Sequence, residues 1–254
     1  MPVKKRIIPL LTVIDNFLVK SINFNKLINV GDPIKSAKIF NDSDADELII
    51  LNIQRENRNV NSFLNLVENI AKNCFMPLAI GGGVNTFEDS KNLFNSGADR
   101  IIINTSIFKN FSLLDEISLN YGKEAIIASL DFKRINNEYY AFSNCGNIKE
   151  SIQIDNLIEK IDNYVGELFI NSIDNDGSMQ GMDINLFKYI SSITDTPLIG
   201  CGGVGNFNHL RDAFLECNLS GVACGSLFNF GDNNPIRAKN FLTNYDLDFK
   251  LINQ

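Results

Sequence analysis

Short apolar runs alternate with amphipathic segments from one end of the chain to the other. The runs are continuous rather than alternating in polarity, which is typical of parallel strands buried on both faces. The pattern therefore predicts eight strands, over Arg6–Val13, Glu47–Ile53, Pro77–Ile80, Arg100–Asn104, Ala125–Asp131, Glu167–Ile173, Pro197–Cys201 and Gly221–Gly225.

The amphipathic segments between these runs predict helices. The first has the chemistry of a helix start, with Asp32 as N-cap and Pro33 at the first helical position. The stretch RINNEYYAFSNCGN, after the fifth strand, predicts an extra hairpin or loop. The predicted helices are Pro33–Phe40, Ser62–Ala71, Thr86–Phe94, Phe111–Leu119, Asn185–Ile193, Phe207–Leu215 and Pro235–Leu242.

The alternation predicts one domain over residues 1–254, because no Pro-, Gly- or Ser-rich linker divides the chain. Eight strand–helix units in a chain of this length fit an α/β fold of the (β/α)8 (TIM) barrel type. The chain also repeats itself without a gap at an offset of 120 residues, since PLAIGGGV at residues 77–84 returns as PLIGCGGV at 197–204. We therefore expect two duplicated half-barrels, at about residues 1–121 and 122–254.

Composition narrows the possible partners. The chain is 44% hydrophobic and has a formal net charge of −7, which argues against a nucleic-acid partner. The five cysteines include no CxxC pair, which favours reduced thiols in the cytoplasm over disulfides or a metal site. The basic, apolar N-terminus is short and lacks a cleavage site, so we interpret it as the first strand. No run approaches ~18 apolar residues, so we predict no membrane span.

Glycines follow one strand in each half, and a Ser or Thr follows the next strand. Glycine at the carboxyl end of a strand lets backbone N–H groups approach an anion, and such barrel loops often bind phosphate. Recurrence in both halves argues against simple tight turns and predicts a substrate phosphorylated at both ends. GCGGVG at residues 200–205 also fits the dinucleotide fingerprint, but its βαβ context is poorly met, and we predict no cofactor.

Carboxylates are expected at the barrel mouth, where active-site groups of this fold lie. Asp131 ends the fifth strand, but its counterpart at an offset of 119 residues is Thr12, so a symmetric acid/base pair is missing. Asp174 and Asp176 follow the sixth strand, whereas the second strand has Asn52. For any single aspartate here, a capping or turn role is as compatible with the pattern as catalysis.

Four charged residues mark the opposite, amino ends of the strands. Buried charges are costly unless they are paired, so two positive and two negative side chains at one level predict a closed ring across the barrel floor. The ring is compatible with a stabilising salt-bridge cluster and with a gate on a passage along the barrel axis. Its members are Arg6, Glu47, Arg100 and Glu167.

Several motifs together resemble one known family, the cyclase subunit of imidazole glycerol phosphate synthase (HisF), over essentially the whole chain. They stand in the order and spacing of that family, as KRIIPLL, LVKSINF, GDPIKSAKIF, ADELIIL, PLAIGGGV, GADRIIINTS, SIDNDGSMQGMD and GSLFNFGD.

The resemblance implies a half-barrel-duplicated fold that docks a glutaminase subunit as a heterodimer and passes ammonia through the barrel to a bis-phosphorylated substrate. It assigns the ammonia gate to Arg6, Glu47, Glu167 and Arg100, where the family usually has lysine. It also places Asp99 at the glutaminase contact. The substrate and phosphate positions carry over as Lys20, Gly82, Asn104, Thr105, Asp176, Gly177, Gly203 and Ser226.

The chain departs from the family where the chemistry occurs. The family cyclises its substrate with two aspartates, and only Asp131 remains here, because Thr12 occupies the other position. Losing one of two acid/base groups costs on the order of 10²–10⁴ in rate. The chain therefore looks like the divergent paralogues found beside surface-polysaccharide genes, which pass ammonia to an ATP-dependent sugar amidotransferase. A genuine histidine-pathway cyclase and a non-catalytic phosphate-binding scaffold are the alternative interpretations.

Overall fold

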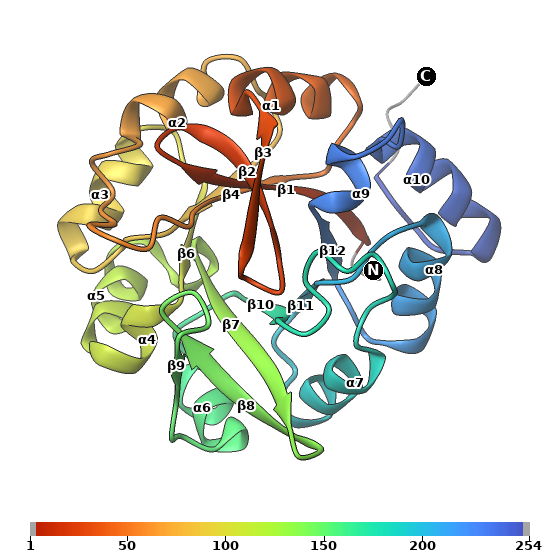
Figure 1. Ribbon diagram of the computed structural model, residues 1–254. Helices are drawn as coiled ribbons and strands as arrows, with labels where there is room; N and C mark the ends of the chain where they lie inside the picture. The colour runs from red at the N-terminus through yellow and green to blue at the C-terminus, as the bar shows by residue number, and fades with distance from the viewer. Residues whose placement is uncertain (1–3, 251–254) are drawn as a thin grey trace.

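Eight parallel strands close into a barrel, as the sequence predicts (Figure 1). The fold is described over residues 4–250 of a computed structural model. The sheet closes because β1 is hydrogen-bonded to both β12 and β4, while β10 is hydrogen-bonded to both β7 and β11. The barrel strands are β1 (Arg6–Ile14), β4 (Leu48–Asn52), β5 (Leu78–Gly81), β6 (Arg100–Ile103), β7 (Ile126–Ile135), β10 (Glu167–Ser172), β11 (Leu198–Cys201) and β12 (Gly221–Cys224).

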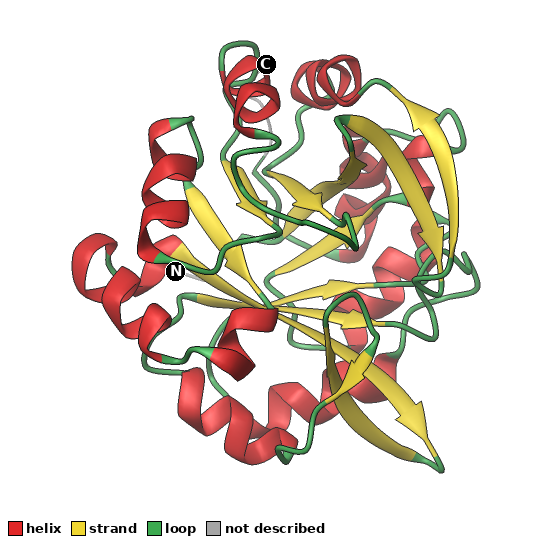
Figure 2. Ribbon diagram, turned by 60° about the vertical axis from the view of Figure 1, so that its left-hand side comes forward, coloured by secondary structure: helices red, strands yellow, loops and turns green. Residues whose placement is uncertain are grey.

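Helices surround the barrel, and all seven predicted helices are confirmed (Figures 1 and 2). Asp32 caps α1 as predicted, since its side chain accepts hydrogen bonds from the N–H groups of Ile34 and Lys35. No helix within residues 4–250 is long and apolar enough to cross a bilayer. The predicted helices are α1 (Pro33–Asp42), α2 (Leu64–Ala71), α3 (Phe87–Asn95), α5 (Ser112–Tyr121), α7 (Ile184–Ile193), α8 (Phe207–Glu216) and α10 (Pro235–Leu242).

The structure also contains helices that the apolar pattern did not predict. The helix α6 (Ile154–Ile161) buries Ile154, Leu157, Ile158 and Ile161, a spacing that places all four on one face. The other additions are short, and two of them begin directly after barrel strands. They are α4 (Thr105–Lys109), α9 (Ser226–Asn229) and the 3₁₀ turns η1 (Lys123–Ala125) and η2 (Thr243–Tyr245).

Two antiparallel hairpins extend from the carboxyl ends of β1 and β7 (Figure 2). The second, formed by β7 with β8 (Glu138–Ser143) and β9 (Ile148–Lys149), confirms the predicted extra hairpin. The first, formed by β1 with β2 (Phe17–Ile22) and β3 (Lys26–Gly31), was not predicted. The sequence signal for it lies in the β1–β2 turn, where Asp15 and Asn16 adopt positive φ angles that these two residue types tolerate.

The apolar core consists of two separate layers. A large cluster fills the space between the strands and the surrounding helices. A smaller cluster fills the barrel interior, so the axis is packed with side chains rather than open. This inner layer separates the floor of the barrel from its mouth. It comprises Ile8, Leu10, Ile49, Ala79, Ile102, Ile127, Phe169, Ile199, Cys201 and Ala223.

Candidate active site

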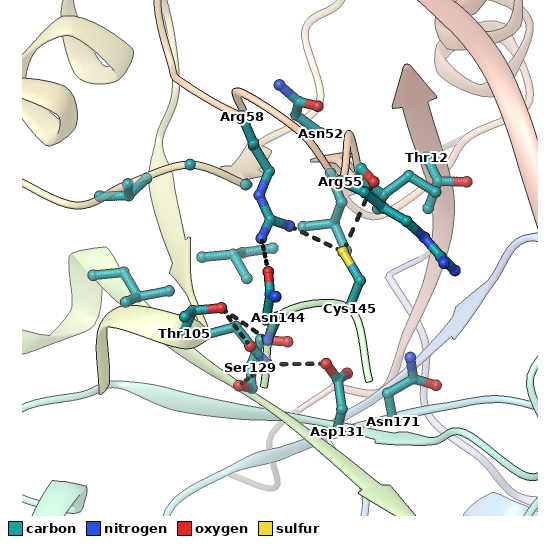
Figure 3. Close-up of a pocket in the computed structure, with 18 of the residues that line it drawn as sticks. Thr12, Asn52, Arg55, Arg58, Thr105, Ser129, Asp131, Asn144, Cys145 and Asn171 are labelled. Atoms are coloured by element: carbon teal, nitrogen blue, oxygen red, sulfur yellow. Dashed lines mark hydrogen bonds between the residues drawn. The ribbon is translucent and has the colours of Figure 1, made fainter. Parts of the chain in front are cut away.

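A cavity of about 360 Å³ opens at the carboxyl ends of the strands. Its walls come from the ends of β1, β4, β5, β6, β7 and β10 and from the two hairpins, and Figure 3 shows how these side chains face one another. The cavity brings together many of the residues that the sequence singled out. These are Thr12, Lys20, Asn52, Gly82, Asn104, Thr105, Asp131 and Asp176.

Asp131 is the buried acid of this cavity, with 8% of its surface exposed. The side-chain amide of Asn104 donates a hydrogen bond of 3.0 Å to Asp131 Oδ2. Burial, and next the nearby Asp176 carboxylate, raise the pKa of Asp131 from 3.8 to about 7, against the opposing hydrogen bonds from Asn171 and Asn104. A carboxyl group with this pKa can both release and accept a proton near neutral pH.

Thr12 does not present a free hydroxyl to the cavity. Thr12 and Val19 are paired in the β1–β2 ladder, and the Thr12 hydroxyl donates a hydrogen bond to the Val19 carbonyl oxygen. Asn52 is likewise held by its own loop, since its Oδ1 accepts a hydrogen bond of 3.0 Å from the Gln54 N–H. Both side chains therefore hydrogen-bond to nearby backbone groups. Neither can gain or lose a proton near neutral pH, as Asp131 can.

The first glycine turn lines the cavity beside Asn104 and Thr105. Gly82 and Gly83 have φ angles of +97° and +91°, in the left-handed region that favours glycine. A Cβ atom at Gly82 would lie 2.1 Å from the Asn52 carbonyl oxygen, so no larger residue fits there. We call Gly82, Gly83, Asn104 and Thr105 the first cradle.

The second glycine turn lines an adjoining hollow of about 10 Å³. Gly177, Gly203 and Ser226 all belong to it, and we call these three residues the second cradle. Lys20 and Asp176 line both spaces. Lys20 is 3% exposed, and a Cβ atom at Gly225 would lie 2.2 Å from its Nζ, so the ammonium group sits against that backbone.

The four charged residues at the barrel floor form a closed ring of ion pairs. Arg6 pairs with Glu47 at 2.8 Å and also with Glu167, while Arg100 pairs with Glu167 at 2.6 Å and also with Glu47. The two carboxylates are almost fully buried, at 1% and 3% exposure. Each carboxylate thus contacts both guanidinium groups, which satisfies the charges that burial would otherwise penalise.

Asp99 lies at the same end of the barrel as this ring, one residue before β6, and its side chain is exposed. Its Oδ2 accepts a hydrogen bond of 2.8 Å from the Leu78 N–H at the start of β5. Its predicted contact with a partner stays a prediction.

Among the cavity-lining residues that sequence analysis did not single out are Arg58, Asn144, Cys145 and Asn171. Asn171 had a usable signal, because it lies near the carboxyl end of β10, where active-site groups are expected. The other three come from the loop after β4 and the turn after β8, and no motif marks them.

Comparison with known proteins agrees with this architecture. The family described as histidine biosynthesis protein matches residues 6–234 of the chain. The chain is also 34% identical, over 248 residues, to the imidazole glycerol phosphate synthase subunit HisF of Campylobacter concisus (strain 13826). That similarity covers 97% of this chain and 98% of the relative. It therefore includes both the floor and the mouth of the barrel.

The raised pKa of Asp131 predicts a pH dependence of stability. An unfolded aspartate has a pKa of about 3.9, so between that value and about 7 the folded protein keeps a proton that the unfolded chain has released. Stability from this group is therefore lost as the pH rises through this window. Between pH 5 and pH 8 we expect the free energy of unfolding to fall by about 2 to 3 kcal/mol more in the wild type than in Asp131→Asn. Urea unfolding at each pH measures this.

The matched control is Asp15→Asn, which changes an exposed aspartate in the β1–β2 turn. Its pH profile should follow that of the wild type. A profile for Asp131→Asn that also follows the wild type would contradict the prediction.

The ring predicts a large cost for removing one of its carboxylates. Glu167→Gln leaves two arginines sharing one carboxylate in a buried site, and we expect the free energy of unfolding to fall by about 3 kcal/mol or more. The control is Glu216→Gln, which breaks an exposed pair with Lys188 of 2.8 Å and should cost less than about 1 kcal/mol. Equal, small losses in the two variants would show that the ring contributes little to stability.

Proposed function

The chain belongs to the histidine biosynthesis protein family, among the HisF-like cyclases of imidazole glycerol phosphate synthase. From that premise we propose that it is the ammonia-receiving subunit of a cytoplasmic glutamine amidotransferase complex. One observation carries the proposal: the floor keeps a complete ring of four ion pairs, while the mouth keeps only one of two expected acids. We further propose that it is a divergent paralogue that supplies ammonia for sugar amidation in surface-polysaccharide biosynthesis.

The floor argues for a passage that opens on demand. Arg6, Glu47, Arg100 and Glu167 meet at one level below the inner core layer, so any small molecule entering along the axis must pass between them. A cluster needed only for stability has no reason to lie across the axis, because apolar residues fill such a space at lower cost. We propose that this ring gates ammonia.

The mouth argues for altered chemistry. Asp131 has the pKa of a working acid/base, but the Thr12 hydroxyl is bound to a backbone carbonyl and cannot serve as a carboxylate base. The two cradles remain at the mouth, and glycine turns of this kind suit the phosphate of a small molecule. We propose that binding is retained at the mouth while the cyclisation step is slowed by about 10²–10⁴.

The alternative is that the chain is a genuine imidazole glycerol phosphate synthase cyclase of histidine biosynthesis. The name of the Campylobacter relative and the intact set of cradle residues favour this alternative. It requires Asp131 to perform both proton-transfer roles alone.

We propose a glutaminase of the HisH type as the partner, docked on the floor as a heterodimer. Asp99 is exposed there, and Phe75, in the loop between α2 and β5, is 92% exposed at the same end of the barrel. Aromatic residues are enriched at protein–protein interfaces, so an exposed ring at this end of the barrel is a reasonable contact for the partner.

Growth of a histidine auxotroph that lacks its own cyclase separates the two functions. We expect the wild-type chain not to restore growth and Thr12→Asp to restore it, because a carboxylate cannot donate to the Val19 carbonyl oxygen and is repelled from it toward the cavity. Thr12→Asn introduces a side chain of the same size as aspartate but without the carboxylic acid, and it should not restore growth. Growth with the wild-type chain would reject the paralogue role and support the histidine-pathway cyclase.

Association with a HisH-type glutaminase tests the docking face. If Phe75 is an energetically important contact with the partner, as we propose, Phe75→Ala should weaken the complex about tenfold or more, which corresponds to about 1.4 kcal/mol. Phe17→Ala removes another exposed ring, 59% exposed, from the mouth end and should change the dissociation constant less than twofold. Calorimetric titration measures both, and glutamine turnover of the pair shows whether the bound chain activates its partner. No binding by the wild-type chain would support the scaffold interpretation.

A further inference from the structure

Arg58 lies in the loop between β4 and α2, and its guanidinium group faces the cavity (Figure 3). The guanidinium group contacts the turn after β8. Arg58 Nη1 lies 3.1 Å from Cys145 Sγ, and Nη2 lies 3.5 Å from Asn144 Oδ1. The half-buried side chain therefore lies against the wall of the cavity and contacts the turn after β8.

The positive charge of Arg58 has no carboxylate partner among residues 4–250, where the ion pairs involve other side chains. Its two contacts are a thiol and an amide oxygen, both of which are neutral or weak acceptors. A guanidinium group offers five N–H donors in a planar fork. Most of these donors remain available to a ligand in the cavity.

Contacts of the Arg58 loop and of the β8 turn place this guanidinium over the first cradle. A Cβ atom at Gly83 would lie 3.3 Å from Arg58 Cγ, so the arginine stem runs beside the glycine turn. On the other side, the Asn144 N–H donates a hydrogen bond of 3.1 Å to Thr105 Oγ1. The glycine turn, Thr105, Asn144 and Arg58 thus surround one end of the cavity.

This end of the cavity is also connected to the buried acid. Thr105 Oγ1 donates a hydrogen bond of 3.3 Å to Asn104 Oδ1, and Asn104 Nδ2 donates one of 3.0 Å to Asp131 Oδ2. Burial and Asp176 dominate the raised pKa of Asp131, and the charge of Arg58 acts in the opposite direction. Arg58 therefore acts electrostatically on the same carboxyl group that lies at the end of this chain of hydrogen bonds.

We propose that Arg58 binds the ligand directly, as the cation that recognises a fully charged oxyanion seated in the first cradle. The inference rests on the proposed function in that the cavity binds a phosphorylated small molecule. Lys20 lies against Gly225 beside the second cradle, so each end of the ligand meets its own cation. A planar fork binds phosphate or carboxylate bidentately, whereas an ammonium group acts as a point charge.

Titration of the isolated protein with inorganic phosphate tests this inference. Binding is monitored by NMR, from the backbone amide signals of Gly82 and Gly83 for the first cradle and of Gly203 for the second. We expect Arg58→Gln to raise the dissociation constant at the first cradle about 10- to 100-fold and to change that at the second less than twofold. Arg58→Lys should recover only part of the loss, because it restores the charge without the fork. A parallel titration with acetate shows whether the cradle accepts a carboxylate.

Arg55→Gln is the matched control, since Arg55 lines the same cavity, is exposed, and donates to the Phe24 carbonyl oxygen. It should weaken phosphate binding less than threefold. Asn144→Ala removes one contact that holds Arg58 but keeps its charge, so it should weaken binding less than Arg58→Gln does. Equal effects of Arg58→Gln and Arg55→Gln, or of Arg58→Gln at both cradles, would overturn the inference.

These titrations use neither ammonia nor the glutaminase. Absence of phosphate binding at the first cradle of the wild-type protein overturns the inference and leaves the ammonia-receiving role standing. Normal phosphate binding at the first cradle with no association to a glutaminase would instead reject the ammonia-receiving role and leave the Arg58 inference standing.

Discussion

Closure of the parallel sheet is the constraint on which the rest of the structure depends. β1 completes the barrel by pairing with β12 on one side and β4 on the other, and the parallel arrangement sends all eight barrel strands in the same direction. All amino ends therefore meet at the floor and all carboxyl ends at the mouth. Residues separated by more than 160 positions, such as Arg6 and Glu167, are brought into contact only because the sheet closes.

The two ends of the barrel differ in how well their polar groups are satisfied. At the floor, each buried carboxylate contacts two guanidinium groups. At the mouth, burial raises the pKa of Asp131, and Asn171 Oδ1 is buried without a hydrogen-bond partner among residues 4–250. Unsatisfied groups cost stability, and they are expected where a ligand completes them. The floor thus has the character of a closed barrier, and the mouth that of a binding site.

The two halves share a backbone pattern but not their chemistry. Each contributes a glycine turn and a hairpin, yet Asp131 on β7 corresponds to Thr12 on β1. The Thr12 hydroxyl donates a hydrogen bond to the Val19 carbonyl oxygen of β2, so it is not left unsatisfied. A local hydrogen bond to the backbone thus accommodates threonine at this position of the barrel.

The sequence by itself determined the barrel strands, seven of the helices, the glycine turns and the set of four charged floor residues, because each is a local pattern of polarity or residue type. It did not reveal α6 or the β2–β3 hairpin, and it left Arg58, Asn144, Cys145 and Asn171 unmarked. These four residues belong to three separate segments, and what they do depends on distances that no spacing encodes. Tertiary structure decided which acid is buried, which hydroxyl is hydrogen-bonded to the backbone and which cation faces the cavity. Burial and hydrogen bonding depend on neighbours that the chain brings together only when it folds.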